Sequence, residues 1–223
     1  MGEAIGAVLP LALGVAVSPI PIIAAILMLL SPRARSTGVA FLLGWVGGIL
    51  VAVVLFALLS SLIPSGDTGE PEPVRGVIKL VLGAGLLLLA VRQWRARPKP
   101  GETAPTPKWM GAVDSMTPVR GVGLGFLLSA VNPKNLLMAV GAGVAIGGAS
   151  LDGGEATVVV VVFVLLASST VAIPVIGYLA ASARLAAPLE SLRVWLVQNN
   201  ATVMGVLLLV IGVAMIGKGI GSF

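Results

Sequence analysis

The sequence contains no cysteine and no histidine, and charged residues make up only 10% of its 223 positions. These absences exclude thiol redox chemistry, iron–sulfur clusters and haem, and they disfavour a zinc or copper site, because such centres depend on Cys or His ligands. The acidic residues lie in predicted loops or at predicted helix ends, so Ser168 and Ser169 lack a neighbouring base that would activate a nucleophile. The sequence also lacks a phosphate-binding loop of the GxxxxGK type. We therefore expect no metal, no cofactor and no enzymatic activity.

The stretches of the sequence that lack charged residues are long and apolar. The sequence is 57% hydrophobic, with a mean hydropathy of +1.08. The uncharged tracts are Ala4–Pro32, Ser36–Gly66, Ala156–Ala183 and Val194–Gly217, and the tract Gly121–Leu151 is interrupted only by Lys134. Each exceeds the roughly 20 residues that span a bilayer core. Because the runs are continuously apolar and do not alternate like barrel strands, they predict an all-α membrane protein.

The charged residues between these tracts predict the orientation in the membrane. We place six transmembrane helices at about 4–30, 37–63, 74–94, 119–148, 156–182 and 200–220. Ten of the 14 basic residues lie in the loops after the first, third and fifth spans, whereas most acidic residues lie on the opposite side. The positive-inside rule puts the basic loops in the cytoplasm and both termini outside. The net charge of +5 indicates contact with an anionic membrane leaflet, not nucleic acid binding.

A basic, Pro-rich segment at 96–115 divides the chain into two halves of three spans, 1–95 and 116–223. Three is an odd number, so two similar halves would insert with opposite orientations, as in the inverted repeats of many transporters. The first span of each half carries a related motif, VSPIPII at Val17–Ile23 and VNPKNLL at Val131–Leu137. The sequence therefore predicts two inverted three-helix repeats, with the first and fourth spans broken near the midplane.

The prolines of these motifs, Pro19, Pro21 and Pro133, predict the breaks. A helical proline removes one hydrogen bond and leaves the carbonyl four residues earlier without its donor. In lipid such a carbonyl must meet protein or a water-filled cavity. A simple packing kink explains one proline, but the matched set indicates a shared substrate site.

Lys134 lies 14 residues after Arg120, roughly 21 Å along a helix, which places it near or beyond the midplane. No acidic residue lies in any span to pair with it. Two interpretations remain open at this stage. Lys134 is an anion-binding or proton-linked residue, or backbone carbonyls freed at Pro19, Pro21 and Pro133 satisfy its charge. Asn132 and Asn135 add amides that cap broken helix ends or bind a polar headgroup.

Other polar residues of the spans are candidates for the same cavity. They are Ser18, Ser129, Ser168, Ser169 and Thr170, although each hydroxyl taken alone is better explained by a bond to its own helix. Arg75 and Lys79 are expected to anchor the third span at the headgroups. The glycines Gly44, Gly47, Gly48, Gly141, Gly143 and Gly147 are expected to permit close helix packing. The segment Pro188–Asn200 is expected to lie along the cytoplasmic interface as an amphipathic helix.

The three-plus-three layout, the SPIPI motif (Ser18–Ile22) and the NPKN motif (Asn132–Asn135) resemble the LysE-type exporter superfamily. Within it, the SPIPI form, the short length and the Pro-rich linker look most like the GAP family, the glycolipid- or sulfolipid-addressing proteins of actinobacteria. The resemblance covers essentially the whole layout. It implies a bacterial plasma-membrane protein that exports a glycolipid or lipid precursor. Amino-acid exporters of the superfamily typically carry an NPGP-like first motif, and this motif lacks that glycine.

Three functions are consistent with these features. The first is an exporter or flippase for an amphipathic, anionic envelope lipid, with Lys134 binding the headgroup. The second is a proton-coupled exporter of small amino acids or related solutes. The third is a membrane scaffold that recruits lipid-export machinery through the linker. The expected partners are an amphipathic substrate and membrane lipids, and a homo-oligomer is compatible with all three functions.

Overall fold

The computed structural model describes residues 1–62, 73–98, 102 and 115–223, and within these ranges it contains α-helices and no strand. The helices are α1 (Gly2–Ala16), α2 (Pro19–Leu29), α3 (Ala34–Ser61), α4 (Pro73–Arg95), α5 (Pro118–Ala130), α6 (Pro133–Gly147) and α7 (Gly153–Ile220). The all-α prediction is confirmed. Most of the predicted linker at 96–115 lies outside the described residues, as does the loop at 63–72.

Two of the predicted spans are bent pairs of helices. α1 and α2 meet at an angle of 52°, and α5 and α6 meet at 62°. Each second helix begins with a proline, Pro19 or Pro133, at a position where the missing N–H would have no helical partner anyway. The residue before each proline, Ser18 or Asn132, is extended, as the proline ring requires. The prolines therefore end one helix and start the next.

α7 contains the last two predicted spans and the segment between them. Its backbone departs from helical geometry at Ala181 (φ −147°, ψ 52°), which divides it into 153–182 and 184–220. The predicted amphipathic segment Pro188–Asn200 is helical throughout. Arg193 donates to Glu190 on this segment, with Nε 2.8 Å from Oε2.

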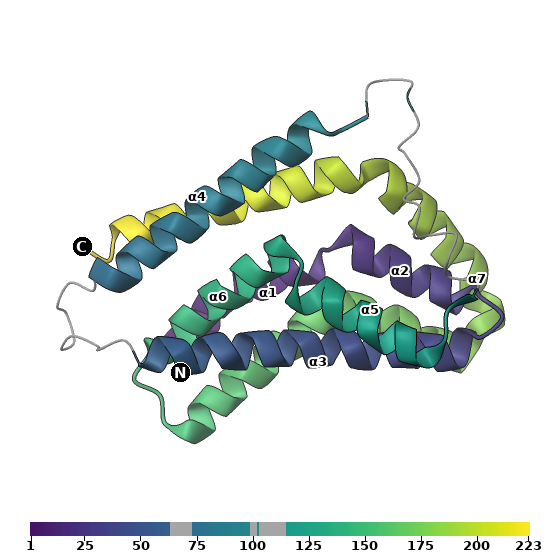
Figure 1. Ribbon diagram of the computed structural model, residues 1–223, viewed down its shortest axis with the longest axis horizontal. Coiled ribbons are helices and arrows are strands. Elements are labelled where there is room, and N and C mark those ends of the chain that lie inside the picture. Colours follow the sequence, from purple (N-terminus) through teal and green to yellow (C-terminus); the bar gives the residue numbers. More distant parts are fainter. Residues whose placement is uncertain (63–72, 99–101, 103–114) are drawn as a thin grey trace.

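Helices from one half of the chain pack mainly against helices from the other half. α3 packs against α5 and α6, α1 and α2 pack against α7, and α4 packs against α7. α5 and α6 run along α3, and the two termini lie at the same end of the molecule (Figure 1). α4 and the last part of α7 run side by side as a layer of their own (Figure 1). The core contains large apolar side chains from most of these helices, among them Ile26, Phe41, Met138, Phe163 and Leu208.

Glycines allow α3 to approach α5 and α6 closely. A Cβ at Gly44 or Gly48 would overlap atoms of α5, and a Cβ at Gly143 or Gly147 would lie about 2.5 Å from atoms of α3. The predicted packing role is confirmed for these four residues. It is wrong for Gly47, where nothing lies within 4 Å, because Gly47 points away from the neighbouring helices.

The length and composition of the helices fit a multi-pass membrane protein. Among the residues that the structure describes, four helical segments are long and apolar enough to cross a bilayer: α3, α4 and the two parts of α7. Each bent pair adds one more crossing if it spans the membrane, which gives four to six crossings. The predicted number of six is the upper value of this range.

Candidate functional site

The two helix breaks lie against each other in the interior. The Ser18 hydroxyl of the first break donates to Oδ1 of Asn135 in the second, at 3.4 Å. Both side chains are buried, each with 2% of its surface exposed. The sequence predicted that the two motifs share one site, and the structure brings Ser18, Asn135 and Lys134 together.

The first break leaves carbonyl groups of α1 without their usual helical donors. The amide of Ser18 donates to the carbonyl of Ala16 at 2.8 Å, so it does not reach the Gly14 carbonyl that a continued helix would offer it. Pro21 has no N–H to donate to the carbonyl of Val17. The carbonyls of Gly14 and Val17 are therefore available to other donors.

Lys134 supplies that donor. Its ammonium nitrogen lies 2.5 Å from the Gly14 carbonyl oxygen and 3.4 Å from that of Val17. The side chain comes from the first turn of α6 and is only 3% exposed. A cation at the C-terminal end of a helix is also favoured by the helix dipole. Carbonyl oxygens thus satisfy Lys134 in this conformation, which is the second of the two interpretations left open by the sequence.

Thr170 completes the contacts to the end of α1. Its hydroxyl, on α7, donates to the carbonyl of Ala16 at 2.5 Å. Three side chains from the second half of the chain, those of Lys134, Asn135 and Thr170, therefore reach the break in the first half. The geometry of this break depends on how the two halves sit against each other.

The second break is capped by its own residues. The Asn132 side chain accepts from the backbone amide of Lys134 at 3.1 Å and so caps the start of α6. The Asn135 amide donates to the carbonyl of Leu128 at 2.9 Å, near the end of α5. These bonds within the second half cap the break, in addition to the bond that Asn135 accepts from Ser18 of the first half.

The remaining predicted site residues do not bond across the breaks. The hydroxyl groups of Ser129, Ser168 and Ser169 bond to carbonyls of their own helices three or four residues earlier. Pro19 and Pro21 are buried beside the site, whereas Pro133 is exposed. Of the predicted hydroxyl residues, Ser18 and Thr170 thus reach a partner on another helix.

Arg75 differs from the sequence-based expectation. The sequence predicts that it extends from α4 to the headgroups, but its side chain is 2% exposed and donates to the carbonyl of Gly147 at 3.4 Å, at the end of α6. Both Arg75 and Lys134 therefore place a cation at the C-terminal end of a helix. Lys79, one turn further along α4, donates to the Ser222 hydroxyl at 2.9 Å.

The arrangement can recognise an anion, because a buried ammonium and two amides converge where the helices are interrupted. In the part of the chain that the structure describes, no group of three or more Asp, Glu, His or Cys side chains is placed to hold a metal ion. The site combines a charged group with neutral carbonyl partners.

Comparison with known proteins identifies a family for the chain. No curated protein and no solved structure matches the chain. The family model described as Sap, sulfolipid-1-addressing protein, matches residues 8–221, which include both helix breaks and all predicted site residues. The chain belongs to the sulfolipid-1-addressing protein family.

Proposed function

We propose that this protein is an exporter or flippase-like transporter of the bacterial plasma membrane for an amphipathic, anionic envelope lipid or glycolipid. The observation that carries the proposal is the family match over residues 8–221, because the family is named for addressing a sulfolipid. A sulfolipid combines apolar chains with a negatively charged headgroup. Lys134, a buried cation at a paired helix break, has the chemistry to bind such a headgroup.

The bonds of Lys134 support a role beyond structure. Within the described residues, both of its partners are backbone carbonyls, which are neutral. A sulfate, phosphate or carboxylate would form stronger, charge-assisted hydrogen bonds with the same ammonium. A headgroup that reaches Lys134 would therefore displace the carbonyls of Gly14 and Val17 and release the end of α1.

The packing of each half against the other supports two inverted repeats and six membrane crossings. Each bent pair packs against the helix that follows the other bent pair: α1 and α2 against α7, and α5 and α6 against α3. The third spans of the two halves, α4 and the last part of α7, pack against each other. This reciprocal pattern is what a two-fold relation between the halves would produce. Transport would then proceed by rocking of one repeat against the other around the shared breaks.

The decisive experiment measures surface exposure of the lipid in cells that lack the protein and are complemented with variants. Lys134→Gln keeps an N–H donor for the carbonyls but removes the positive charge. Loss of one charge-assisted bond, about 1.5–3 kcal/mol, predicts a roughly 10-fold to 100-fold fall in lipid reaching an impermeant surface label. Lys218→Gln, on an exposed residue of α7, is the matched control and should restore exposure fully.

Membrane abundance and thermal midpoint of each variant separate lost transport from lost folding. If the lipid is fully exposed at the surface in cells with Lys134→Gln, the positive charge of Lys134 is not required for transport. If the deletion strain shows normal lipid exposure and the protein instead moves labelled amino acids in proteoliposomes, a solute exporter would replace the lipid transporter.

A further inference from the structure

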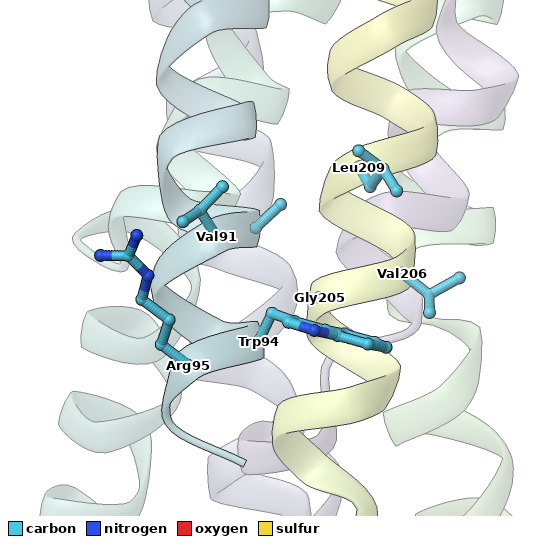
Figure 2. Close-up of a pocket in the computed structure, with 7 residues that line it drawn as sticks. Val91, Trp94, Arg95, Gly205, Val206 and Leu209 are labelled. Atoms are coloured by element: carbon cyan, nitrogen blue, oxygen red, sulfur yellow. The ribbon is translucent and has the colours of Figure 1, made fainter.

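An apolar groove lies between α4 and the last part of α7, away from the helix breaks. It has a volume of about 300 Å³ and is lined by Ala90, Val91, Trp94, Arg95, Gly205, Val206 and Leu209. Figure 2 shows Trp94 lying across α7 at Gly205, with Val206 and Leu209 further along that helix and Arg95 on the other side of α4. Arg95 is the only charged residue of this lining.

The groove exists because the two helices diverge toward this end. At Gly212 an added Cβ would lie 2.9 Å from Leu87 and 3.1 Å from the Gly83 carbonyl, so the helices touch there. At Gly205 an added Cβ would lie 3.5 Å from the Trp94 ring and 3.6 and 3.7 Å from the Trp94 nitrogen and the Ala90 carbonyl oxygen, which are ordinary contact distances, so the helices are only slightly further apart there. The small residues Ala90 and Gly205 therefore form a floor where larger residues would close the gap.

The walls of the groove are open to the surroundings. Val91, Trp94, Val206 and Leu209 are each about half exposed, at 50%, 47%, 48% and 51%. In a membrane protein such residues face lipid tails and not water. At about 1.5 Å per residue, the lining covers roughly 6–8 Å of each helix, and the volume is at the small end for ligand sites. The space suits a section of one acyl chain and not a whole lipid.

The charge at the end of the groove indicates the headgroup. Arg95 is the last residue of α4, and Arg92 lies one turn earlier. The guanidinium of Arg97 stacks on the Trp94 ring, 4.0 Å from its centroid. Two of these cations are thus tied to the groove, Arg95 as part of its lining and Arg97 through the Trp94 ring, and the rest of the lining is apolar. Basic residues at this position attract anionic lipids at the membrane surface.

We propose that this groove binds one acyl chain of an anionic lipid from the leaflet at the basic end of the protein, with the lipid headgroup on Arg95. The proposal does not depend on transport, because a lipid can occupy the groove without crossing the membrane. The surface would hold a membrane lipid between α4 and α7, the two helices that contribute the third span of each half.

The test uses the full-length protein in nanodiscs of phosphatidylcholine that contain a small fraction of phosphatidylglycerol with a photoreactive acyl chain. Irradiation should label peptides that contain residues 90–95 and 205–209. Gly205→Leu fills the floor and should reduce this labelling at least five-fold. Gly217→Leu places the same side chain on the same helix, at an exposed position with nothing within 4 Å, and should leave labelling unchanged.

The headgroup is tested separately. With photoreactive phosphatidylcholine as the probe, labelling should be several-fold weaker than with phosphatidylglycerol, and Arg95→Gln should abolish that difference. Equal labelling of the wild type and Gly205→Leu would overturn the site, and equal labelling by both lipids would overturn its anionic preference. A dimer in the wild type that Gly205→Leu dissociates would show a second copy of the chain in the groove, which also overturns the proposal. Lys134→Gln should label normally, so failure of the transport proposal leaves this result intact.

Discussion

At the scale of single residues, the end of α1 is held by side chains that are far away in the sequence. Lys134 bonds to the carbonyls of Gly14 and Val17, and Thr170 bonds to the carbonyl of Ala16. A continued helix would have satisfied the carbonyls of Gly14 and Ala16 locally, whereas that of Val17 would still lack a donor because Pro21 has no N–H. The break thus places bonds between the two halves at the end of α1. Such bonds hold the halves together in this conformation, and the rocking motion proposed above would have to break them.

Thr170→Val should weaken the protein more than Ser169→Ala. Valine keeps the shape of threonine but removes the hydroxyl that reaches Ala16 on another helix. Interhelical hydrogen bonds in membrane proteins contribute about 0.6 kcal/mol on average and up to about 1.7 kcal/mol, and we expect a loss within this range. Ser169 bonds only to Leu166 of its own helix, so its removal should be nearly neutral. Thermal unfolding in detergent measures both, and equal midpoints would show that the Thr170 bond adds no stability.

The sequence predicted part of this site. Pro21 identified the Val17 carbonyl as one without a donor, because that loss follows from the covalent structure of proline. The role of Gly14 depends instead on the turn of the Ser18 amide toward Ala16, which is a detail of backbone geometry. The bond from Thr170 depends on helix packing, since its neighbours Ser168 and Ser169 have the same chemistry but face their own helix. The sequence-based prediction for Arg75 is wrong because a guanidinium near a helix end has two favourable partners. It can reach the lipid headgroups, or it can bond to the carbonyl end of a neighbouring helix, as it does here.

At the scale of helices, the second bent pair, α5 and α6, packs against α3. Gly44 and Gly48 face α5, and Gly143 and Gly147 of α6 face α3. Close approach of backbones is the main way in which membrane helices gain packing energy, because lipid tails are as apolar as the side chains. The glycine spacing predicted such contacts, but not which face of α3 makes them.

Gly44→Ala and Gly47→Ala form a matched pair on one helix. The new methyl group at Gly44 would overlap the backbone of α5 at Val122, and overpacking of this kind costs about 1–3 kcal/mol. At Gly47 the methyl group meets nothing within 4 Å, and the better helix propensity of alanine contributes a gain of up to about 1 kcal/mol. We therefore expect opposite shifts in thermal midpoint. A similar shift for both variants would mean that α3 and α5 are not in close contact at Gly44.

At the scale of the whole molecule, the bent pairs decide the topology. If each pair crosses the membrane, the chain has six crossings. If each is a re-entrant loop, it has four. The sequence favoured six because basic residues gather in alternate loops. The structure adds that α5 and α6 run along α3 and that both termini lie at one end of the molecule (Figure 1).

Single cysteines can test this directly, because the natural sequence has none. Glu3→Cys, Ser36→Cys, Ser150→Cys and Ser191→Cys introduce a thiol at exposed positions before and after the bent pairs and between the two parts of α7. With six crossings, an impermeant maleimide should label the thiols at positions 3 and 150 on intact spheroplasts but reach those at positions 36 and 191 only after lysis. With four crossings, the thiols at positions 3, 36 and 150 would all react alike, and the one at position 191 would differ. The thiol at position 36 therefore discriminates between the two topologies, since it is the one whose side changes relative to position 3 when the α1–α2 pair crosses the membrane.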